Sequence, residues 1–346
     1  MKMNPLGRTG ITVSRICLGT MTFGQQNTEE DAHRQLDMAL DHGVNFIDTA
    51  EAYSFPGRPE TQGRSEEIIG TWMQARGNRD KVVIATKITG PSNERSHIRN
   101  GKLDFSREQV TAAVDLSLKR LKTDVIDLYQ THWPERKANY FGKLDYVHAG
   151  IQDFTPMEEQ IDALGEQVKA GKVRAIGVSN ETAWGVMKFL EIAERTGLPR
   201  LASIQNPYNL ICRQFDIGLA EPAMREDVGL LAYSPLAFGA LTGKYLDGQL
   251  PEGSRHKLFP QFKRYFKPNG VKAVEAYVAL ARVHGLEPSQ MALAFVHSRP
   301  FLTSTIIGAT TEEQLKSNLE TEDMTLPEDV LERIEAIHAD NPNPGP

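Results

Sequence analysis

The chain has 346 residues, of which 40% are hydrophobic and 24% are charged, and a formal net charge of −6 at pH 7. This composition is that of a globular protein with a full apolar core, and its acidic balance argues against nucleic acid or an anionic membrane as a partner. The two cysteines, Cys17 and Cys212, predict neither a disulfide framework nor a metal site. Because no apolar stretch is long enough to span a bilayer and the N-terminus does not resemble a signal peptide, we expect a cytoplasmic protein.

Short apolar runs alternate with longer amphipathic stretches along the chain. Residues 1–14 contain Gly7 and Gly10 around a turn and predict a β-hairpin. Eight runs rich in β-branched residues follow, each apolar nearly throughout, as parallel strands covered on both faces are. These runs are Ile16–Leu18, Val44–Ile47, Val82–Ala85, Val125–Tyr129, Ala175–Val178, Leu201–Ile204, Leu230–Tyr233 and Ser304–Ile307.

Stretches with helical periodicity separate these runs. Several of them end at a glycine, the residue that most readily adopts the left-handed conformation after a helix. The predicted helices are 29–41, 65–76, 107–121, 157–170, 183–195 and 271–284, with a terminal helix at 326–338. Residues 133–154 and 243–269 are predicted to be long loops.

The repetition of strand and helix predicts a closed parallel barrel of the (β/α)₈ kind, which needs about 250 residues before insertions. An open doubly wound sheet would carry a G-x-G-x-x-G motif after its first strand, and Gly19–Gly24 does not match it. A P-loop is excluded as well, because residues 239–244 are one residue short. We therefore expect residues 1–346 to form a single α/β domain, a TIM barrel with an N-terminal β-hairpin, a C-terminal helix and an insertion at 133–154 near the active site.

Polar residues follow three consecutive predicted strands, at the end of a TIM barrel where active sites lie. Asp48, Lys87 and His132 end the second, third and fourth strands, and Tyr53 lies in the loop after Asp48. A lysine ammonium beside the tyrosine would lower its pKa from about 10, and the carboxylate would hold the lysine. The histidine could donate a hydrogen bond to a substrate oxygen. The cluster predicts proton delivery to an oxygen gaining negative charge, although each residue alone also fits a cap, a solvated lysine or a packed ring.

Ordered motifs along almost the whole chain resemble those of the aldo-keto reductases, in particular a bacterial branch related to the potassium-channel β subunits. These motifs lie at 19–21 (GTM), 46–53 (FIDTAEAY), 63–70 (GRSEEIIG), 86–87 (TK), 117–121 (SLKRL), 127–133 (DLYQTHW) and 171–180 (GKVRAIGVSN). The resemblance implies that Tyr53 is the general acid, that Lys87 and Asp48 tune it, and that His132 orients the substrate carbonyl.

The resemblance also implies that NADPH binds across the barrel mouth without a Rossmann domain. Ser179, Asn180 and Gln205 match positions that hydrogen-bond the nicotinamide carboxamide, and Tyr233 matches the aromatic ring that stacks on the nicotinamide. From the residues alone, two plainer interpretations stay open: Ser179 and Asn180 could cap the next helix, and Gln205 could lie in a plain turn.

Residues 234–244 resemble the family's pyrophosphate-binding loop, and 307–318 its adenosine site. The expected contacts of the loop are Ser234, Pro235, Leu236, Gly239, Leu241, Gly243 and Lys244. Those of the adenosine site are Gly308, Thr310, Gln314 and Asn318, at a turn before a helix N-terminus that suits a phosphate. Thr310 and Gln314 offer little positive charge for a 2′-phosphate, so the use of NADPH rather than NADH is an expectation from the resemblance.

Aromatic residues near the mouth predict an apolar substrate pocket lined by Phe23, Phe55 and Trp133, although loop packing explains them equally well. Arg99 and Arg136 are candidates for binding a substrate carboxylate. The predicted function is the NADPH-dependent reduction of a small-molecule aldehyde or ketone, by one specific enzyme or by a broad-range detoxifying one. The alternative is an NADPH-binding regulatory module resembling channel β subunits, with slow or no turnover. The sequence determines neither the substrate nor the oligomeric state.

Overall fold

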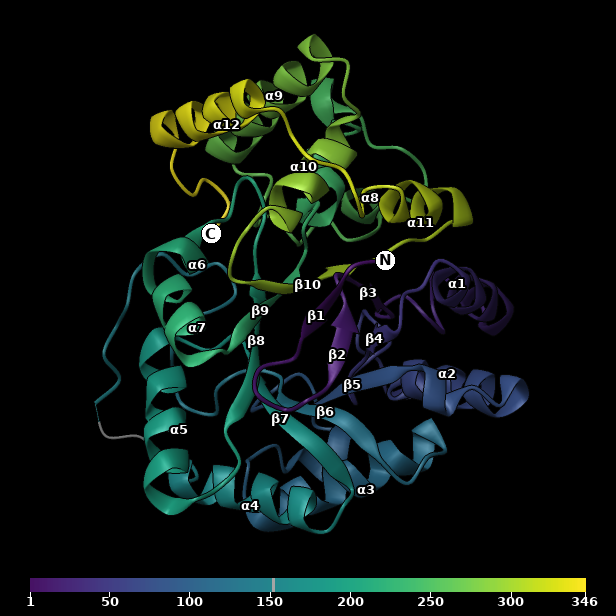
Figure 1. Ribbon diagram of the computed structural model, residues 1–346, viewed down its shortest axis with the longest axis vertical. Coiled ribbons are helices and arrows are strands. Elements are labelled where there is room, and N and C mark those ends of the chain that lie inside the picture. The colour runs from purple at the N-terminus through teal and green to yellow at the C-terminus, as the bar shows by residue number, and fades with distance from the viewer. Residues whose placement is uncertain (151–152) are drawn as a thin grey trace.

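The computed structural model describes residues 1–150 and 153–346. Its main sheet is a closed barrel of parallel strands in the order β10-β3-β4-β5-β6-β7-β8-β9, with helices around it (Figure 1). The strands are β3 Ile16–Gly19, β4 Phe46–Asp48, β5 Val83–Ile88, β6 Ile126–Thr131, β7 Val173–Ser179, β8 Leu201–Pro207, β9 Gly229–Tyr233 and β10 Leu302–Ile307. The predicted TIM barrel is therefore confirmed.

Each of the eight predicted runs overlaps one barrel strand, but several of the bounds differ. Val44, Val82 and Val125 precede β4, β5 and β6 and belong to the turns that enter the barrel. The amide of Val44, for example, donates to the carbonyl of Ala39 at 2.9 Å, so that it still belongs to the end of the preceding helix. The entry turns are buried like the strands and are therefore equally apolar, so the sequence pattern cannot show where a turn ends and its strand begins.

The predicted helices are confirmed, and the chain forms further ones. The helices are α1 Glu29–Asp41, α2 Arg64–Arg76, α3 Arg107–Leu121, α4 Met157–Lys169, α5 Ala183–Thr196, α6 Gln214–Gly218, α7 Ala220–Glu226, α8 Arg255–Leu258, α9 Pro268–Val283, α10 Pro288–His297, α11 Glu312–Leu319 and α12 Glu328–Asp340. Short 3₁₀ helices are η1 Pro59–Thr61, η2 Arg79–Lys81, η3 Ile98–Gly101, η4 Ala237–Thr242 and η5 Leu246–Gly248.

The helices missed by the sequence pattern are short or buried on nearly every side. Helix α8 lies inside the predicted loop 243–269, where its one turn is too short for a periodic pattern. Helix α10 buries a continuous run from Met291 to Val296, so it has no polar face to reveal its period. The described part of the predicted loop 133–154 forms no helix or strand, and its residues 151–152 lie outside the described residues.

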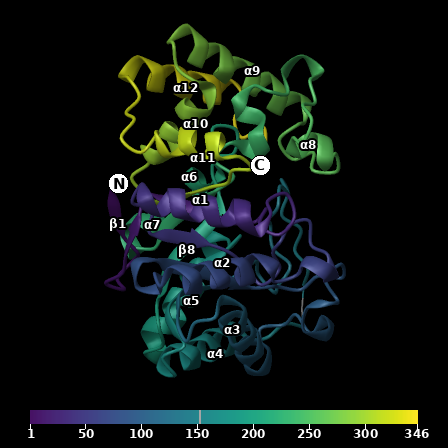
Figure 2. The same ribbon diagram turned by 90° about the vertical axis from the view of Figure 1, so that its right-hand side faces the viewer.

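The N-terminal hairpin closes one end of the barrel. Strand β1, Met3–Pro5, pairs antiparallel with β2, Thr12–Ser14, and Figure 1 shows both strands across the middle of the ring of helices. Leu6, Ile11 and Val13 are buried with side chains of the barrel interior, among them Phe46. Seen from the side, β1 lies at one end of the molecule and α8 at the other (Figure 2). The hairpin thus leaves only the C-terminal ends of the strands as an open mouth.

Two remaining features of the sequence have simple structural outcomes. Cys17 and Cys212 are both buried free thiols. In the part of the chain that the structure describes, no helix combines the length and the apolarity that crossing a membrane requires.

Candidate active site

Three neighbouring strands bring the predicted catalytic residues to the open mouth of the barrel. Asp48 is the last residue of β4, Lys87 lies one residue before the end of β5, and His132 directly follows β6. In the parallel register Asp48 lies beside Ala85 and Lys87 beside Gln130, so each of the three residues lies two positions further along its strand than the one before. Tyr53 lies in the loop after β4, and its ring reaches back over the lysine. The structure therefore brings all four residues together.

A buried ion pair forms the base of the site. The ammonium of Lys87 donates to Asp48 Oδ2 and to the carbonyl of Thr49, each at 2.7 Å. Lys87 is completely buried and Asp48 exposes 2% of its surface, so each ion depends on the other for its charge. Burial alone would lower the pKa of Lys87, but the negative charge of Asp48 and the Tyr53 phenol outweigh it and raise that pKa. Lys87 is therefore a fixed positive charge.

Tyr53 lies directly beside this charge. The Lys87 nitrogen is 5.0 Å from the centre of the Tyr53 ring, and the His132 ring meets the same ring edge-on at 5.7 Å between centres. Burial raises the pKa of the Tyr53 phenol, and the opposing effect of Lys87 is smaller. Lys87 lowers this pKa as predicted, but desolvation of the phenolate has the larger effect, so the pKa of Tyr53 still lies above its ordinary value. Tyr53 is thus a protonated phenol beside a fixed cation.

His132 is held as a neutral imidazole. Burial, and after it the positive charges of Lys87 and Arg95, keep the pKa of His132 well below its ordinary range. Its Nδ1 is buried and has no hydrogen-bond partner among the described residues, while its carbonyl accepts from Asn180 Nδ2 at 2.9 Å. The backbone is therefore fixed, and the ring keeps hydrogen-bonding capacity that a ligand can use.

The four residues predicted to face a nicotinamide surround this cluster. Ser179 ends β7 and Tyr233 ends β9, and the Tyr233 hydroxyl donates to Asn180 Oδ1 at 2.6 Å. Gln205 Nε2 donates to Asp48 Oδ1 at 2.7 Å. Gln205 therefore lies in β8 rather than in a plain turn, and it holds the second oxygen of the Asp48 carboxylate.

The helix-cap interpretation of Ser179 and Asn180 is wrong too. The N-cap of α5 is Thr182, whose side chain accepts from the amide of Gly185. Asn180 instead bridges the carbonyl of His132 and the Ser179 hydroxyl. The two side chains that looked like caps thus belong to the polar lining of the mouth.

The predicted pyrophosphate loop is a compact turn around η4. Gly239 has a φ of +87°, and a Cβ there would lie 3.1 Å from the Lys244 nitrogen. A side chain there would be strained at this φ and would crowd the lysine, so glycine suits the turn. Gly243 ends η4 with a φ of +79°, and the carbonyl of Ser234 accepts from Asn209 Nδ2 at 2.9 Å. Pro235, Leu236 and Leu241 complete the turn, and Lys244 makes no ion pair within the described parts of the chain.

The predicted adenosine site lies where β10 leads into α11. Thr311 caps α11, and the amide of Thr310 donates to Gln314 Oε1 at 3.0 Å. Gly308 precedes this turn and Asn318 is buried on the helix. The first turn of α11 carries two glutamates, and Glu312 pairs with Arg34 at 2.8 Å. The low positive charge expected from the sequence is thus also seen in the structure.

Comparison with known proteins shows which family has this arrangement. A model of the Aldo/keto reductase family matches residues 15–339. The chain belongs to the aldo/keto reductase family. It is 50% identical over 346 residues to Protein tas of Escherichia coli, with 100% of both chains covered.

Two further relatives span almost the same length. The chain is 34% identical over 346 residues to the uncharacterized oxidoreductase YrpG of Bacillus subtilis, covering 100% of this chain and 97% of that one. It is 31% identical over 360 residues to a probable voltage-gated potassium channel subunit beta of Arabidopsis thaliana, covering 99% and 98%. The family predicted from the motifs is therefore confirmed, and with it an oxidoreductase.

The predicted aromatic wall of this aldo/keto reductase is present only in part. The Trp133 ring packs against His132 with 4.8 Å between centres, and Phe55 lies 5.2 Å from Phe262. Phe23, by contrast, is completely buried among core side chains, so no part of it reaches a pocket. Its place directly after the first barrel strand fitted the mouth, but the chain there turns the ring inward.

The two arginines suggested for a substrate carboxylate are occupied inside the protein. Arg99 pairs with the buried Glu51 at 3.2 Å, and Arg136 pairs with the buried Glu181 through both of its terminal nitrogens. The sequence pattern could not reveal these partners, because each pair joins residues more than forty positions apart.

Sequence reasoning missed two other arginines at the mouth, Arg95 and Arg255. The Arg255 guanidinium lies 4.2 Å from the centre of the Phe238 ring in η4, and its buried Nε has no partner among the described residues. Burial lowers the pKa of Arg255 to about 10. Arg95 lies in an irregular loop and Arg255 begins the one-turn helix α8, so neither periodicity nor a motif distinguishes them from solvated arginines.

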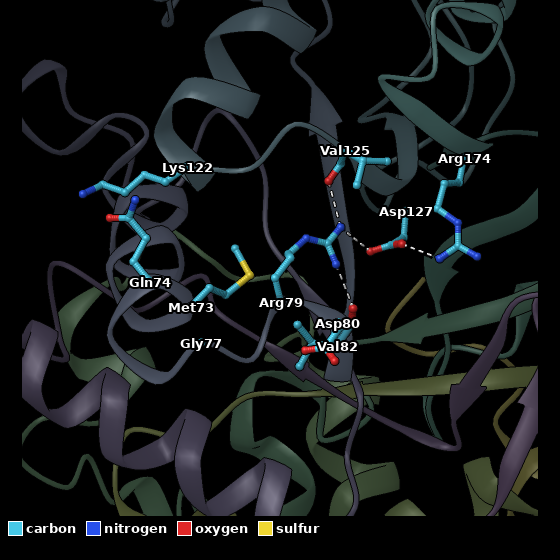
Figure 3. Close-up of a pocket in the computed structure, with 10 residues that line it drawn as sticks. All are labelled: Met73, Gln74, Gly77, Arg79, Asp80, Val82, Lys122, Val125, Asp127 and Arg174. Carbon is cyan, nitrogen blue, oxygen red and sulfur yellow. Dashed lines mark hydrogen bonds and ion pairs between the residues drawn. The ribbon is translucent and has the colours of Figure 1, made fainter.

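A separate pocket of about 540 Å³ lies at the opposite end of the strands (Figure 3). Arg79 there donates to the carbonyl of Val125 and to Asp127 Oδ2, and Arg174 donates to Asp127 Oδ1 at 2.7 Å. Asp127 also accepts from the amide of Ile84. These polar groups satisfy one another and tie β5, β6 and β7 together, so the pocket has a structural explanation.

Proposed function

We propose that this protein reduces the carbonyl group of an aldehyde or ketone with NADPH, and that Tyr53 donates the proton. One observation carries the proposal. A protonated phenol lies beside a buried lysine cation that is fixed by an ion pair, and a neutral imidazole contacts the same phenol ring. This combination suits an oxygen that gains negative charge and then takes up a proton.

The role of each side chain follows from its place. As the carbonyl oxygen gains charge, Tyr53 transfers its phenolic proton to it, and the alcohol is formed. The Lys87 ammonium stabilises the phenolate that remains, and Asp48 holds Lys87 in the charged form. His132 donates a hydrogen bond to the same oxygen from its neutral ring and thereby orients the carbonyl. When bound, NADPH supplies the hydride.

The residues at the mouth fit such a cofactor. Ser179, Asn180 and Gln205 would hold its carboxamide, and Tyr233 would stack on its ring. The loop 234–244 would hold its diphosphate, with Lys244 and Arg255 as cations, and 308–318 its adenosine. Two observations support this fit to the diphosphate. The buried Nε of Arg255 beside the loop has no hydrogen-bond partner among the described residues, and Lys244 makes no ion pair with them. We expect NADPH rather than NADH, as the resemblance to the family implies.

The decisive experiment follows NADPH oxidation with an activated aromatic aldehyde, and NADH is run in parallel. We expect steady turnover, a preference for NADPH, and a loss of about 10²–10⁴-fold in kcat for Tyr53→Phe. The Kd for NADPH should not change, because the phenol hydroxyl acts on the substrate oxygen. Tyr146→Phe, which removes a hydroxyl from a largely exposed side chain, is the matched control.

Two outcomes would contradict the proposal. Turnover that survives in Tyr53→Phe would assign the proton to another group. Tight NADPH binding without turnover across a broad panel of carbonyl compounds would favour a regulatory module. The relative in Arabidopsis thaliana that is named a channel subunit makes this second outcome worth testing.

A further inference from the structure

We propose that the substrate carries a carboxylate close to its carbonyl group, and that Arg95 binds this carboxylate. The inference rests on the proposed function and narrows its substrate class from carbonyl compounds in general to keto acids and aldehyde acids. Arg95 lies in the loop between β5 and α3, beside the mouth.

The position of Arg95 is defined by two neighbouring loops. Its guanidinium lies 5.8 Å from the centre of the Trp133 ring, and Trp133 packs against His132. On its other side, a Cβ at Gly57 would lie only 2.6 Å from Arg95 Nη1, so the guanidinium packs against the backbone there. Gly57 belongs to the loop that also carries Tyr53. Arg95 thus bridges the segments that hold the proposed proton donor and the residue proposed to orient the carbonyl.

The loop that carries Arg95 is anchored firmly. Arg99 donates to Glu51 Oε1 at 3.2 Å, to the carbonyl of Thr89 at 3.1 Å and to the carbonyl of Lys102 at 2.8 Å. Ile98 and Leu103 are buried in a small cluster with Ala52. Because these contacts tie down the loop just beyond Arg95, its guanidinium is positioned before any ligand arrives.

The charge of Arg95 lacks a carboxylate partner in the part of the chain that the structure describes. It makes no ion pair with a carboxylate among residues 1–150 and 153–346, whereas Arg99 and Arg136 nearby are both paired with buried glutamates. The side chain is half-buried, so part of its hydration is lost without replacement. Its charge acts on the site itself, since it contributes to the lowered pKa of His132. A carboxylate could form the two parallel hydrogen bonds that a guanidinium makes best.

Arg255 is a further arginine at the mouth that forms no ion pair among the described residues, and its position assigns it to the cofactor. It stacks on Phe238 within the loop predicted to bind pyrophosphate, whereas Arg95 stacks on Trp133 next to His132. Because His132 is the residue proposed to bind the carbonyl oxygen, an anion on Arg95 would lie within a few bonds of the carbonyl. This places the carboxylate on the substrate rather than on the nucleotide.

The test compares 3- and 4-carboxybenzaldehyde with their methyl esters, which have nearly the same shape but no charge. We expect the wild type to prefer the acids in kcat/KM. Arg95→Met should lower kcat/KM for the acids roughly 10- to 100-fold, mainly through KM, and leave the esters within about threefold. Arg95→Lys should restore part of the preference, since it keeps a positive charge without the bidentate geometry.

A control variant and two contrary results decide whether Arg95 binds the carboxylate. Arg299→Met removes an arginine that stacks on Phe295 far from the mouth, and it should not change the ratio of acid to ester. Equal losses for acids and esters in Arg95→Met, or no loss, would overturn the inference. A loss of acid preference in Arg255→Met alone would move the carboxylate to Arg255 and overturn it too.

A binding measurement separates this inference from the proposed function. Calorimetry with 4-(hydroxymethyl)benzoate and its methyl ester, in the presence of NADPH, requires no turnover. If no carbonyl compound is reduced, the proposed function fails. Weaker binding of the acid alone in Arg95→Met would then still support the anion site, and equal binding in the variant and the wild type would rule it out.

Discussion

At the residue scale, Lys87 shows how the barrel stabilises a charged ammonium in a completely buried position. A completely buried ammonium would ordinarily lose its charge, but Asp48, the carbonyl of Thr49 and the Tyr53 ring surround it. Asp48 is in turn held by Gln205 from the opposite side of the barrel. Removing either ion would leave the other buried without a partner, which costs about 3–5 kcal/mol in such pairs. The same arrangement that keeps the lysine charged also fixes it beneath the phenol.

The pKa shifts at this site predict a simple pH dependence of catalysis. Burial raises the pKa of Tyr53 and lowers that of His132, so the phenol stays protonated and the imidazole stays neutral across the neutral range. We expect kcat/KM for the carbonyl, at saturating NADPH, to be constant around pH 6.5 and to fall only above about pH 10, as Tyr53 loses its proton. A pH profile from 5.5 to about 10.5 measures this, and an inflection near pH 6.5 would show that His132 titrates like an exposed histidine.

At the scale of elements, the N-terminal hairpin completes the interior of the barrel. The strands alone leave their inward-facing side chains open at one end, and Leu6, Ile11 and Val13 fill that opening. The hairpin strands are only three residues long, so their own hydrogen bonds contribute little. Packing of the turn residues against the barrel is therefore what holds the hairpin in place.

We expect Leu6→Ala to lower the free energy of unfolding by about 2–5 kcal/mol, because it leaves a cavity at a completely buried site. The kcat should not change, since the hairpin lies at the end of the barrel opposite the mouth. Urea unfolding and steady-state kinetics measure the two effects. Met3→Ala, at a position 46% exposed on β1, is the control. A loss of activity in the folded Leu6→Ala protein would contradict the separation of stability from catalysis.

At the scale of the whole molecule, the helices packed outside the barrel bury a histidine whose protonation makes the stability of the fold depend on pH. His297 ends α10, exposes 5% of its surface, and shares a hydrogen bond of 3.3 Å with the carbonyl of Thr321 beyond α11. Burial lowers the pKa of His297 to about 4. An unfolded chain protonates this residue near pH 6.5, so protons favour the unfolded state. The contribution of neutral His297 is therefore complete above pH 6.5 and is lost as the pH falls toward 4.

The expected loss of stability from His297 between pH 7 and pH 4 is roughly 3 kcal/mol, because folding lowers its pKa from about 6.5 to about 4. His297→Asn keeps an N–H donor for Thr321 but does not titrate, so its stability should fall less over the same range. Urea unfolding at several pH values compares the variant with wild type and with His148→Asn, an exposed control. Parallel pH slopes for His297→Asn and wild type would contradict the assignment.

The sequence by itself determined the class of the fold, the number of barrel strands and the four side chains that meet at the mouth of the barrel. It could do so because parallel strands are short and apolar, and because strand ends in this fold share one mouth. It also predicted the family, since the motifs around Asp48, Lys87 and His132 are ordered along the chain.

Only the tertiary structure decided which charges are free. The sequence suggested Arg99 and Arg136 as free to bind a substrate, but both are paired with buried glutamates. It gave no sign of Arg95 and Arg255. The ion-pair partner of an arginine lies on a loop distant in sequence, so the pattern cannot show which arginines are unpaired. The direction of the Tyr53 pKa shift was hidden for a similar reason. It depends on how much burial outweighs one nearby cation, and burial is a property of the packed molecule. The inward turn of Phe23 followed from packing as well. Local patterns therefore determine which side chains reach the mouth, whereas long-range contacts decide their charge and their freedom to bind.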